Sequence, residues 1–140
     1  MTRGFTLLEL IVVIIILGIL ATLALSQYGS TIERTRGAEA RTILGLVRLQ
    51  ALAYRMDEEN LDLLTPAQAG IGTSNDQAPS TCRQSHYFSY SIVASGDILT
   101  GIATRCTAGG KTPNYTAANV LFLISDLNQG TDEWTGTGFY

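Results

Sequence analysis

The residue of this 140-residue chain with the clearest chemical potential is Glu9, an acid at the edge of a long uncharged run. No charged residue occurs from Leu10 to Ile32, and most positions between residues 5 and 25 are leucine, isoleucine, valine or phenylalanine. A mid-membrane charge costs about 3 kcal/mol, whereas these apolar residues together favour insertion by about 4 to 9 kcal/mol. Glu9 can therefore enter a membrane, and we expect it to pair there with a cation.

The two cysteines, Cys82 and Cys106, lie outside the uncharged run. No Cys-x-x-Cys motif and no Cys/His cluster accompanies them, which disfavours a metal site. An even number of cysteines in an exported domain favours a disulfide, which we predict between Cys82 and Cys106. Closing a loop of about 25 residues contributes about 3.5 kcal/mol in the chain-entropy description. Two buried free thiols in a reducing compartment are the alternative.

A set of oxygen-bearing side chains occurs near the C-terminus. Asp126, Asn128 and Asp132 are spaced around Gly130 somewhat like the ligands of a calcium loop. The pattern fails the full EF-hand expression, so a hairpin turn is the favoured interpretation and a calcium site is the alternative. The sequence predicts no other cofactor.

No catalytic constellation can be assembled from the remaining residues. The single histidine, His86, has no nucleophile in a recognisable setting. Residues 109–112 resemble the end of a phosphate-binding loop, but the first glycine of that motif would fall at Arg105. We therefore expect a protein that is not an enzyme. The net charge of −3 argues against nucleic acid as the primary partner.

The elements that position these residues begin with a long helix. As a helix, residues 5–25 are about 31 Å long, which matches a hydrocarbon core of about 30 Å. Apolar residues then recur at three- and four-residue spacing to about Met56, and no proline occurs before Pro66. We expect one helix whose first half spans a membrane and whose amphipathic second half packs on a domain. A short helical turn is expected near residues 66–69.

From His86 the period of the apolar residues changes to two. This change predicts strands over residues 87–93 and 98–106, with Ile98, Ile102 and Cys106 on one face. The apolar run 120–124 predicts a third strand, and residues 133–135 a short fourth one. The predicted fold class is α+β: a long N-terminal helix packed on a small antiparallel sheet of three to four strands.

The first thirty residues resemble a known family. Gly4-Phe5-Thr6-Leu7-Leu8-Glu9 follows the short basic leader Met1-Thr2-Arg3 and precedes the uncharged run. This arrangement is similar to the class III signal of type IV pilins and type II secretion pseudopilins. The resemblance implies cleavage after Gly4 by a prepilin peptidase, N-methylation of Phe5 as the new N-terminus, and helical polymerisation. It also implies a pilin-like fold, with calcium bound near the C-terminus in some major pseudopilins.

This resemblance divides the chain into four segments. Residues 1–4 are the leader peptide, 5–25 the transmembrane and assembly helix, 26–57 the amphipathic continuation, and 58–140 a globular head with a variable loop. The family usually has a proline where this chain has Ser26. A proline there kinks the helix, so its absence makes local melting of this helix in a filament less expected.

Cleavage after Gly4 places an amine four residues before Glu9, which is one helical turn. Glu9 can then pair with its own amine or with that of a neighbouring subunit, and the sequence leaves both open. We expect a single-pass inner-membrane protein with its head outside the cytoplasm, which then joins a homo-oligomeric periplasmic or cell-surface filament. A motor and platform proteins must drive assembly, since no nucleotide-binding motif is present. The sequence does not separate a type IV pilus from a secretion pseudopilus.

An ordinary signal peptide is the alternative for the N-terminus. Arg3, the apolar stretch and Ala24-Leu25-Ser26 have the layout that a general signal peptidase recognises. Cleavage there leaves a secreted or singly anchored binding domain that never polymerises. Two features argue against it, because the apolar run exceeds the usual 7 to 15 residues and begins with an acid.

Overall fold

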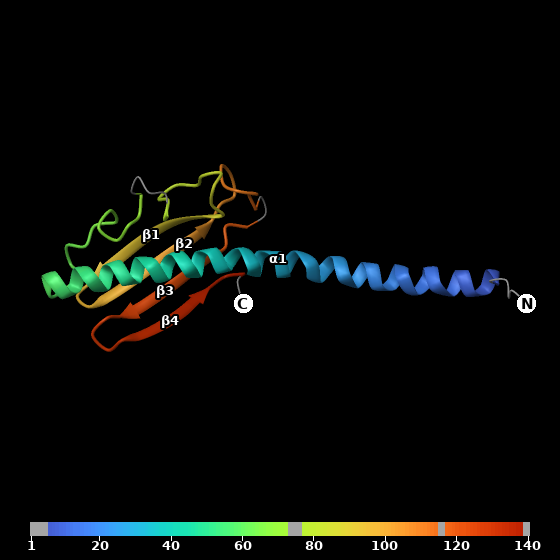
Figure 1. The fold of residues 1–140 in the computed structure, drawn as a ribbon, viewed down its shortest axis with the longest axis horizontal. Coiled ribbons are helices and arrows are strands. Elements are labelled where there is room, and N and C mark those ends of the chain that lie inside the picture. Colours follow the sequence, from blue (N-terminus) through green and yellow to red (C-terminus); the bar gives the residue numbers. More distant parts are fainter. Residues whose placement is uncertain (1–5, 73–76, 115–116, 139–140) are drawn as a thin grey trace, which may run out of the picture. The chain divides into compact units, whose positions relative to one another are not determined.

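The computed structural model describes residues 6–72, 77–114 and 117–138. The elements in chain order are the helix α1 (Leu7–Glu58) and the strands β1 (Phe88–Ser95), β2 (Ile98–Arg105), β3 (Val120–Asp126) and β4 (Thr131–Gly136) (Figure 1). The α+β fold expected from the sequence is confirmed, and α1 ends two residues beyond the predicted Met56. The chain forms two compact units, residues 1–33 and 34–140, and α1 contributes to both.

The second unit contains an antiparallel sheet in the order β1-β2-β3-β4 (Figure 1). Each strand pairs with the next one along the chain, so the connections can be short. Gly96 and Asp97 turn β1 into β2, and Gly96 has a φ of 58°, which glycine adopts without strain. The predicted fourth strand is confirmed and extends over Thr131–Gly136.

The core lies between the sheet and the part of α1 from Arg34 onward. One face of α1 is buried at three- and four-residue spacing, as an amphipathic helix requires. The buried helix residues are Ala40, Ile43, Leu44, Val47 and Ala51; the buried strand residues are Phe88, Tyr90, Leu99, Ala103, Leu121 and Leu123. The predicted alternation in β1 is confirmed, since Phe88 and Tyr90 are both fully buried.

The prediction that Ile98 and Ile102 lie on the core face of β2 is wrong. Ile98 is 48% exposed and Ile102 is only half-buried, whereas Leu99 and Ala103 are fully buried. The reason is the close approach of α1 to β2, because a Cβ at Gly101 would lie 3.0 Å from Leu44 Cδ2. The core face of β2 therefore needs a residue without a side chain at Gly101, and Ile98 and Ile102 lie on the other face.

The connection from α1 to β1 closes the remaining side of the core. Ala69 N donates to Thr65 O and Ile71 N donates to Pro66 O, which confirms the predicted short helical turn. Leu61 and Ala69 are fully buried and belong to the core cluster. The loop is therefore held by packing as well as by backbone hydrogen bonds.

Candidate functional site

The amino end of α1 is closed by reciprocal hydrogen bonds between Thr6 and Glu9. Thr6 N and Thr6 Oγ1 each donate to Glu9 Oε2 at 2.9 Å, and Glu9 N donates to Thr6 Oγ1 at 3.2 Å. This is a capping box, in which two side chains satisfy backbone donors that the first helical turn leaves free. A carboxylate there also faces the positive end of the helix dipole.

The sequence analysis did not predict Thr6 as a partner of Glu9. The segment Thr6-Leu7-Leu8-Glu9 matches the Ser/Thr-x-x-Glu/Gln pattern that begins many helices, so the signal was present. The predicted processing residues Gly4 and Phe5 lie outside the described residues. Within the described ranges, hydrogen bonds to Glu9 use only Oε2, so Oε1 can accept a further donor such as an amine.

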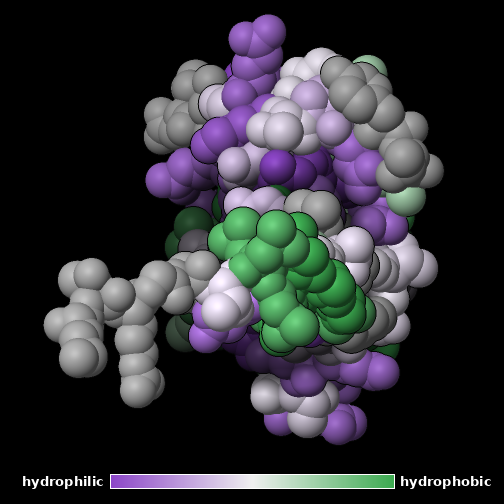
Figure 2. Space-filling view, turned by 90° about the vertical axis from the view of Figure 1, so that its right-hand side faces the viewer, coloured by the Kyte–Doolittle hydropathy of each residue, from purple (hydrophilic) through white to green (hydrophobic). Residues whose placement is uncertain are grey.

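The surface that follows Glu9 is apolar and exposed. Figure 2 shows this stretch of α1 as a continuous hydrophobic surface. Its large side chains between Leu7 and Leu23 are 43% to 76% exposed. Among the described residues, α1 is the one helix that is long and apolar enough to cross a membrane. Such a surface has to be covered by lipid or by protein.

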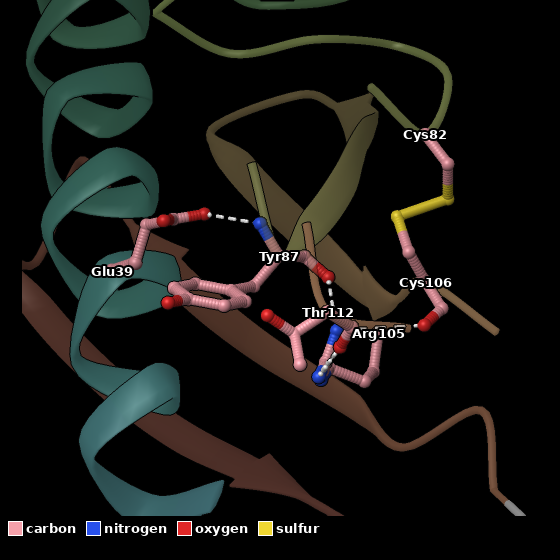
Figure 3. Close-up of a disulfide and its surroundings, with 6 residues drawn as sticks. All are labelled: Glu39, Cys82, Tyr87, Arg105, Cys106 and Thr112. Atoms are coloured by element: carbon pink, nitrogen blue, oxygen red, sulfur yellow. Dashed lines mark hydrogen bonds between the residues drawn. A yellow bond between two sulfur atoms is a disulfide. The ribbon is translucent and has the colours of Figure 1, made fainter. Parts of the chain in front are cut away.

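The predicted disulfide between Cys82 and Cys106 is present (Figure 3). Cys106 is buried and directly follows the end of β2, whereas Cys82 comes from the connection before β1. The bridge joins residues 24 positions apart. It therefore ties the long connection to the end of β2.

Arg105 is a buried cation beside this disulfide, and the sequence analysis did not predict its burial. Its side chain is 1% exposed and donates to Tyr87 O at 3.0 Å and Thr112 O at 2.6 Å (Figure 3). The guanidinium also lies 5.4 Å from the centre of the Tyr87 ring. On the side of Tyr87 that faces α1, its backbone N donates to Glu39 Oε1 at 2.9 Å. Arg105 thus organises the loops around the disulfide.

The three predicted calcium ligands have other partners. Asp126 Oδ1 accepts the backbone N–H groups of Asn128 and Gln129 at 3.0 Å, which builds the predicted hairpin turn between β3 and β4. Asp132 Oδ1 accepts from Arg48 Nε at 2.6 Å. The Asn128 side-chain oxygen accepts a hydrogen bond from Arg55 Nη2 at 3.3 Å. In the described part of the chain no three His, Cys, Asp or Glu side chains gather as metal ligands.

Two comparisons connect the geometry with known proteins. Residues 1–25 match the prokaryotic N-terminal methylation motif. Over 132 residues the chain is 27% identical to the fimbrial protein EcpC of Eikenella corrodens, covering 94% of this chain and 80% of that protein. Both matches are consistent with a type IV pilin-like family. No solved structure matches it. The matched motif contains the Thr6–Glu9 cap and most of the uncharged run.

Proposed function

We propose that this pilin-like chain is a structural subunit of a type IV pilus, assembled through the uncharged part of α1. The observation that carries the proposal is the exposed apolar surface of α1, which lies within the matched methylation motif and is headed by Glu9. In the precursor this surface is covered by lipid, and in the filament by the same surface of other subunits. The contacts between successive subunits are head-to-tail, and because they do not close into a ring they form an open filament.

Processing creates the partner of Glu9. A prepilin peptidase cleaves after Gly4 and Phe5 becomes the methylated N-terminus. The new amine pairs with Glu9 of a neighbouring subunit, since an unpaired carboxylate in an apolar medium is costly. The capping box supports this role, because Thr6 holds the Glu9 carboxylate at the helix end and leaves Oε1 available.

The remaining partners are the inner membrane and the assembly machinery. Arg3 and the new N-terminus stay on the cytoplasmic side, which puts the head outside the inner membrane. Lifting an apolar helix out of a bilayer needs work from an assembly motor and platform. A surface pilus is favoured over a secretion pseudopilus because the similar protein of Eikenella corrodens is a fimbrial protein.

The test is to sequence the N-terminus of the mature chain and to compare two alanine variants. We expect the mature chain to begin at Phe5, whereas a start near Gln27 would show an ordinary signal peptide. Glu9→Ala should insert into the membrane as the wild type does and reduce sheared filament yield at least tenfold. Glu133→Ala, which removes an exposed acid from β4, is the control and should assemble normally. Normal filament yield from Glu9→Ala would rule out the pairing role.

A further inference from the structure

α1 has a second uncharged face, on the side opposite its buried stripe. We call it the outer face; its members are Ala38, Thr42, Leu46, Leu49, Ala53 and Met56, all exposed. Leu49 is 56% exposed and Met56 is 79% exposed. These positions recur every three or four residues, so they form one strip along the helix. An exposed apolar strip of this length usually marks a contact with another molecule.

A charge without a partner among the described residues lies at the start of the outer face. Four arginines of α1 recur seven residues apart, at positions 34, 41, 48 and 55. Arg41 lies 5.7 Å from the ring centre of Trp134, Arg48 bonds Asp132, and Arg55 bonds Asp97. Arg34 makes no such contact with any described residue and is exposed.

The opposite charge lies at the end of the outer face. Asp57, Glu58 and Glu59 are exposed, and no hydrogen bond or ion pair joins their side chains to another described residue. Acids at a helix C-terminus oppose the helix dipole. Glu59 also has a φ of 67°, which is strained for a residue other than glycine. These locally unfavourable choices indicate a role outside the subunit.

The spacing of the charges on α1 defines one register between two copies. Glu9 precedes Arg34 by 25 positions, and Arg34 precedes Asp57 by 23. A parallel second copy shifted by about 24 residues, or about 36 Å of helix, therefore brings both pairs together. Its Glu9 meets Arg34 of the first copy, and its Arg34 meets Asp57. The uncharged run between them then covers the outer face.

The antiparallel arrangement is excluded by the same charges. If the uncharged run covered the outer face in the opposite direction, Arg34 would meet Arg34 and Glu9 would meet the acidic helix end. Like charges in an apolar contact repel strongly, because little water remains to screen them. The charge pattern therefore selects one direction as well as one register.

We infer that the outer face of α1 is the docking surface for the uncharged run of a second, parallel copy of this chain, with Arg34 of that copy against Asp57 and Glu58. The inference rests on the proposed filament and assigns its register. It gives Glu9 a second cationic neighbour, Arg34 of the adjoining subunit, beside the processed amine.

The test reverses the charges in the full chain, expressed with its processing and export apparatus. Arg34→Glu should reduce filament yield at least tenfold, and so should the pair Asp57→Arg with Glu58→Arg. The two arginine substitutions place positive charges at the C-terminal end of α1, where they interact favourably with the helix dipole. Impaired assembly therefore cannot be explained by a weakened helix end. Combining all three substitutions restores opposite charges between positions 34 and 57 but leaves Glu9 facing an acid at position 34. The yield should therefore recover at least threefold over that of Arg34→Glu without reaching the wild-type yield.

The outer face is tested with two matched arginine substitutions. Leu49→Arg introduces a charge on the outer face and should abolish filaments. Leu63→Arg changes a leucine that is 78% exposed in the connection after α1, and should leave the yield unchanged. The melting temperature of each variant in detergent checks that the head is folded.

The outcomes separate this inference from the proposed function. Wild-type filaments together with recovery in the triple variant support the register. If the wild type forms filaments but Arg34→Glu has a normal filament yield, the register is wrong and the pilus proposal still stands. The same conclusion follows if the triple variant shows no recovery of filament yield. A processed wild-type chain that forms no filaments overturns both.

Discussion

Arg48 Nε lies 2.6 Å from Asp132 Oδ1, which joins α1 to β4. Ser125 Oγ donates to the same carboxylate oxygen at 2.7 Å. Arg55 makes a similar link to Asp97 in the turn between β1 and β2. The side chains of Arg48 and Asp132 are 21% and 36% exposed, so each such ion pair contributes about 0.2 to 1 kcal/mol. The seven-residue spacing of the arginines thus places cations beside acids of the sheet.

Acid should weaken the link between Arg48 and Asp132. Partial burial alone would raise the pKa of Asp132, but the hydrogen bonds from Ser125 and Arg48 outweigh it and lower that pKa. A lowered folded-state pKa adds stability above the unfolded value of about 3.9, and this stability is lost as pH falls through the folded value. Asp132→Asn should therefore flatten the fall in free energy of unfolding below about pH 4. The measurement is urea unfolding from pH 7 to pH 2.

Glu133→Gln provides the control for this titration. Glu133 neighbours Asp132 on β4 but is exposed. With Glu133→Gln, the free energy of unfolding should fall below about pH 4 as it does in the wild type. An Asp132→Asn profile that parallels the wild type would contradict the assignment.

Removing the disulfide should destabilise the second unit. Replacing Cys82 and Cys106 together by serine should lower the free energy of unfolding by about 2 to 5 kcal/mol, because the unfolded chain regains loop entropy. The measurement is thermal or urea unfolding, with the oxidised state checked by intact mass before and after reduction. Two free thiols in the native protein would contradict the pairing.

Arg105→Lys should lower stability by about 1 to 3 kcal/mol. A lysine ammonium lacks the planar fork that lets Arg105 donate to Tyr87 O and Thr112 O together, so a buried carbonyl loses its partner. The exposed substitution Arg41→Lys is the matched control and should change stability by less than about 0.5 kcal/mol. Equal effects of the two substitutions would show that the buried hydrogen bonds contribute little.

Calcium should leave the protein unchanged. A site loaded at about 100 times its Kd would stabilise the fold by about 2.7 kcal/mol, which a melting experiment detects readily. We expect millimolar calcium to give no such stabilisation, because Asp126 is bonded to the turn amides and Asp132 to Arg48. A rise in melting temperature that Asp126→Asn removes would instead establish the calcium site.

The sequence by itself determined α1, the methylation motif and the position of the sheet. Local rules are sufficient for these features, because the uncharged run after Glu9, the helical period up to Met56 and the two-residue period of β1 each lie within one segment. The disulfide was also predictable, since only Cys82 and Cys106 were available to form it.

Only the tertiary structure decided which face of β2 is buried and how the charged residues are used. The two faces of β2 have similar hydrophobicity, and the choice follows from the close approach of Leu44 to Gly101. Arg105 is buried because carbonyl groups from separate loops converge on its guanidinium. Asp132 resembles a metal ligand in sequence, but folding places it beside Arg48, 84 positions away in the chain. Contacts between distant residues are set by packing, which no local period encodes.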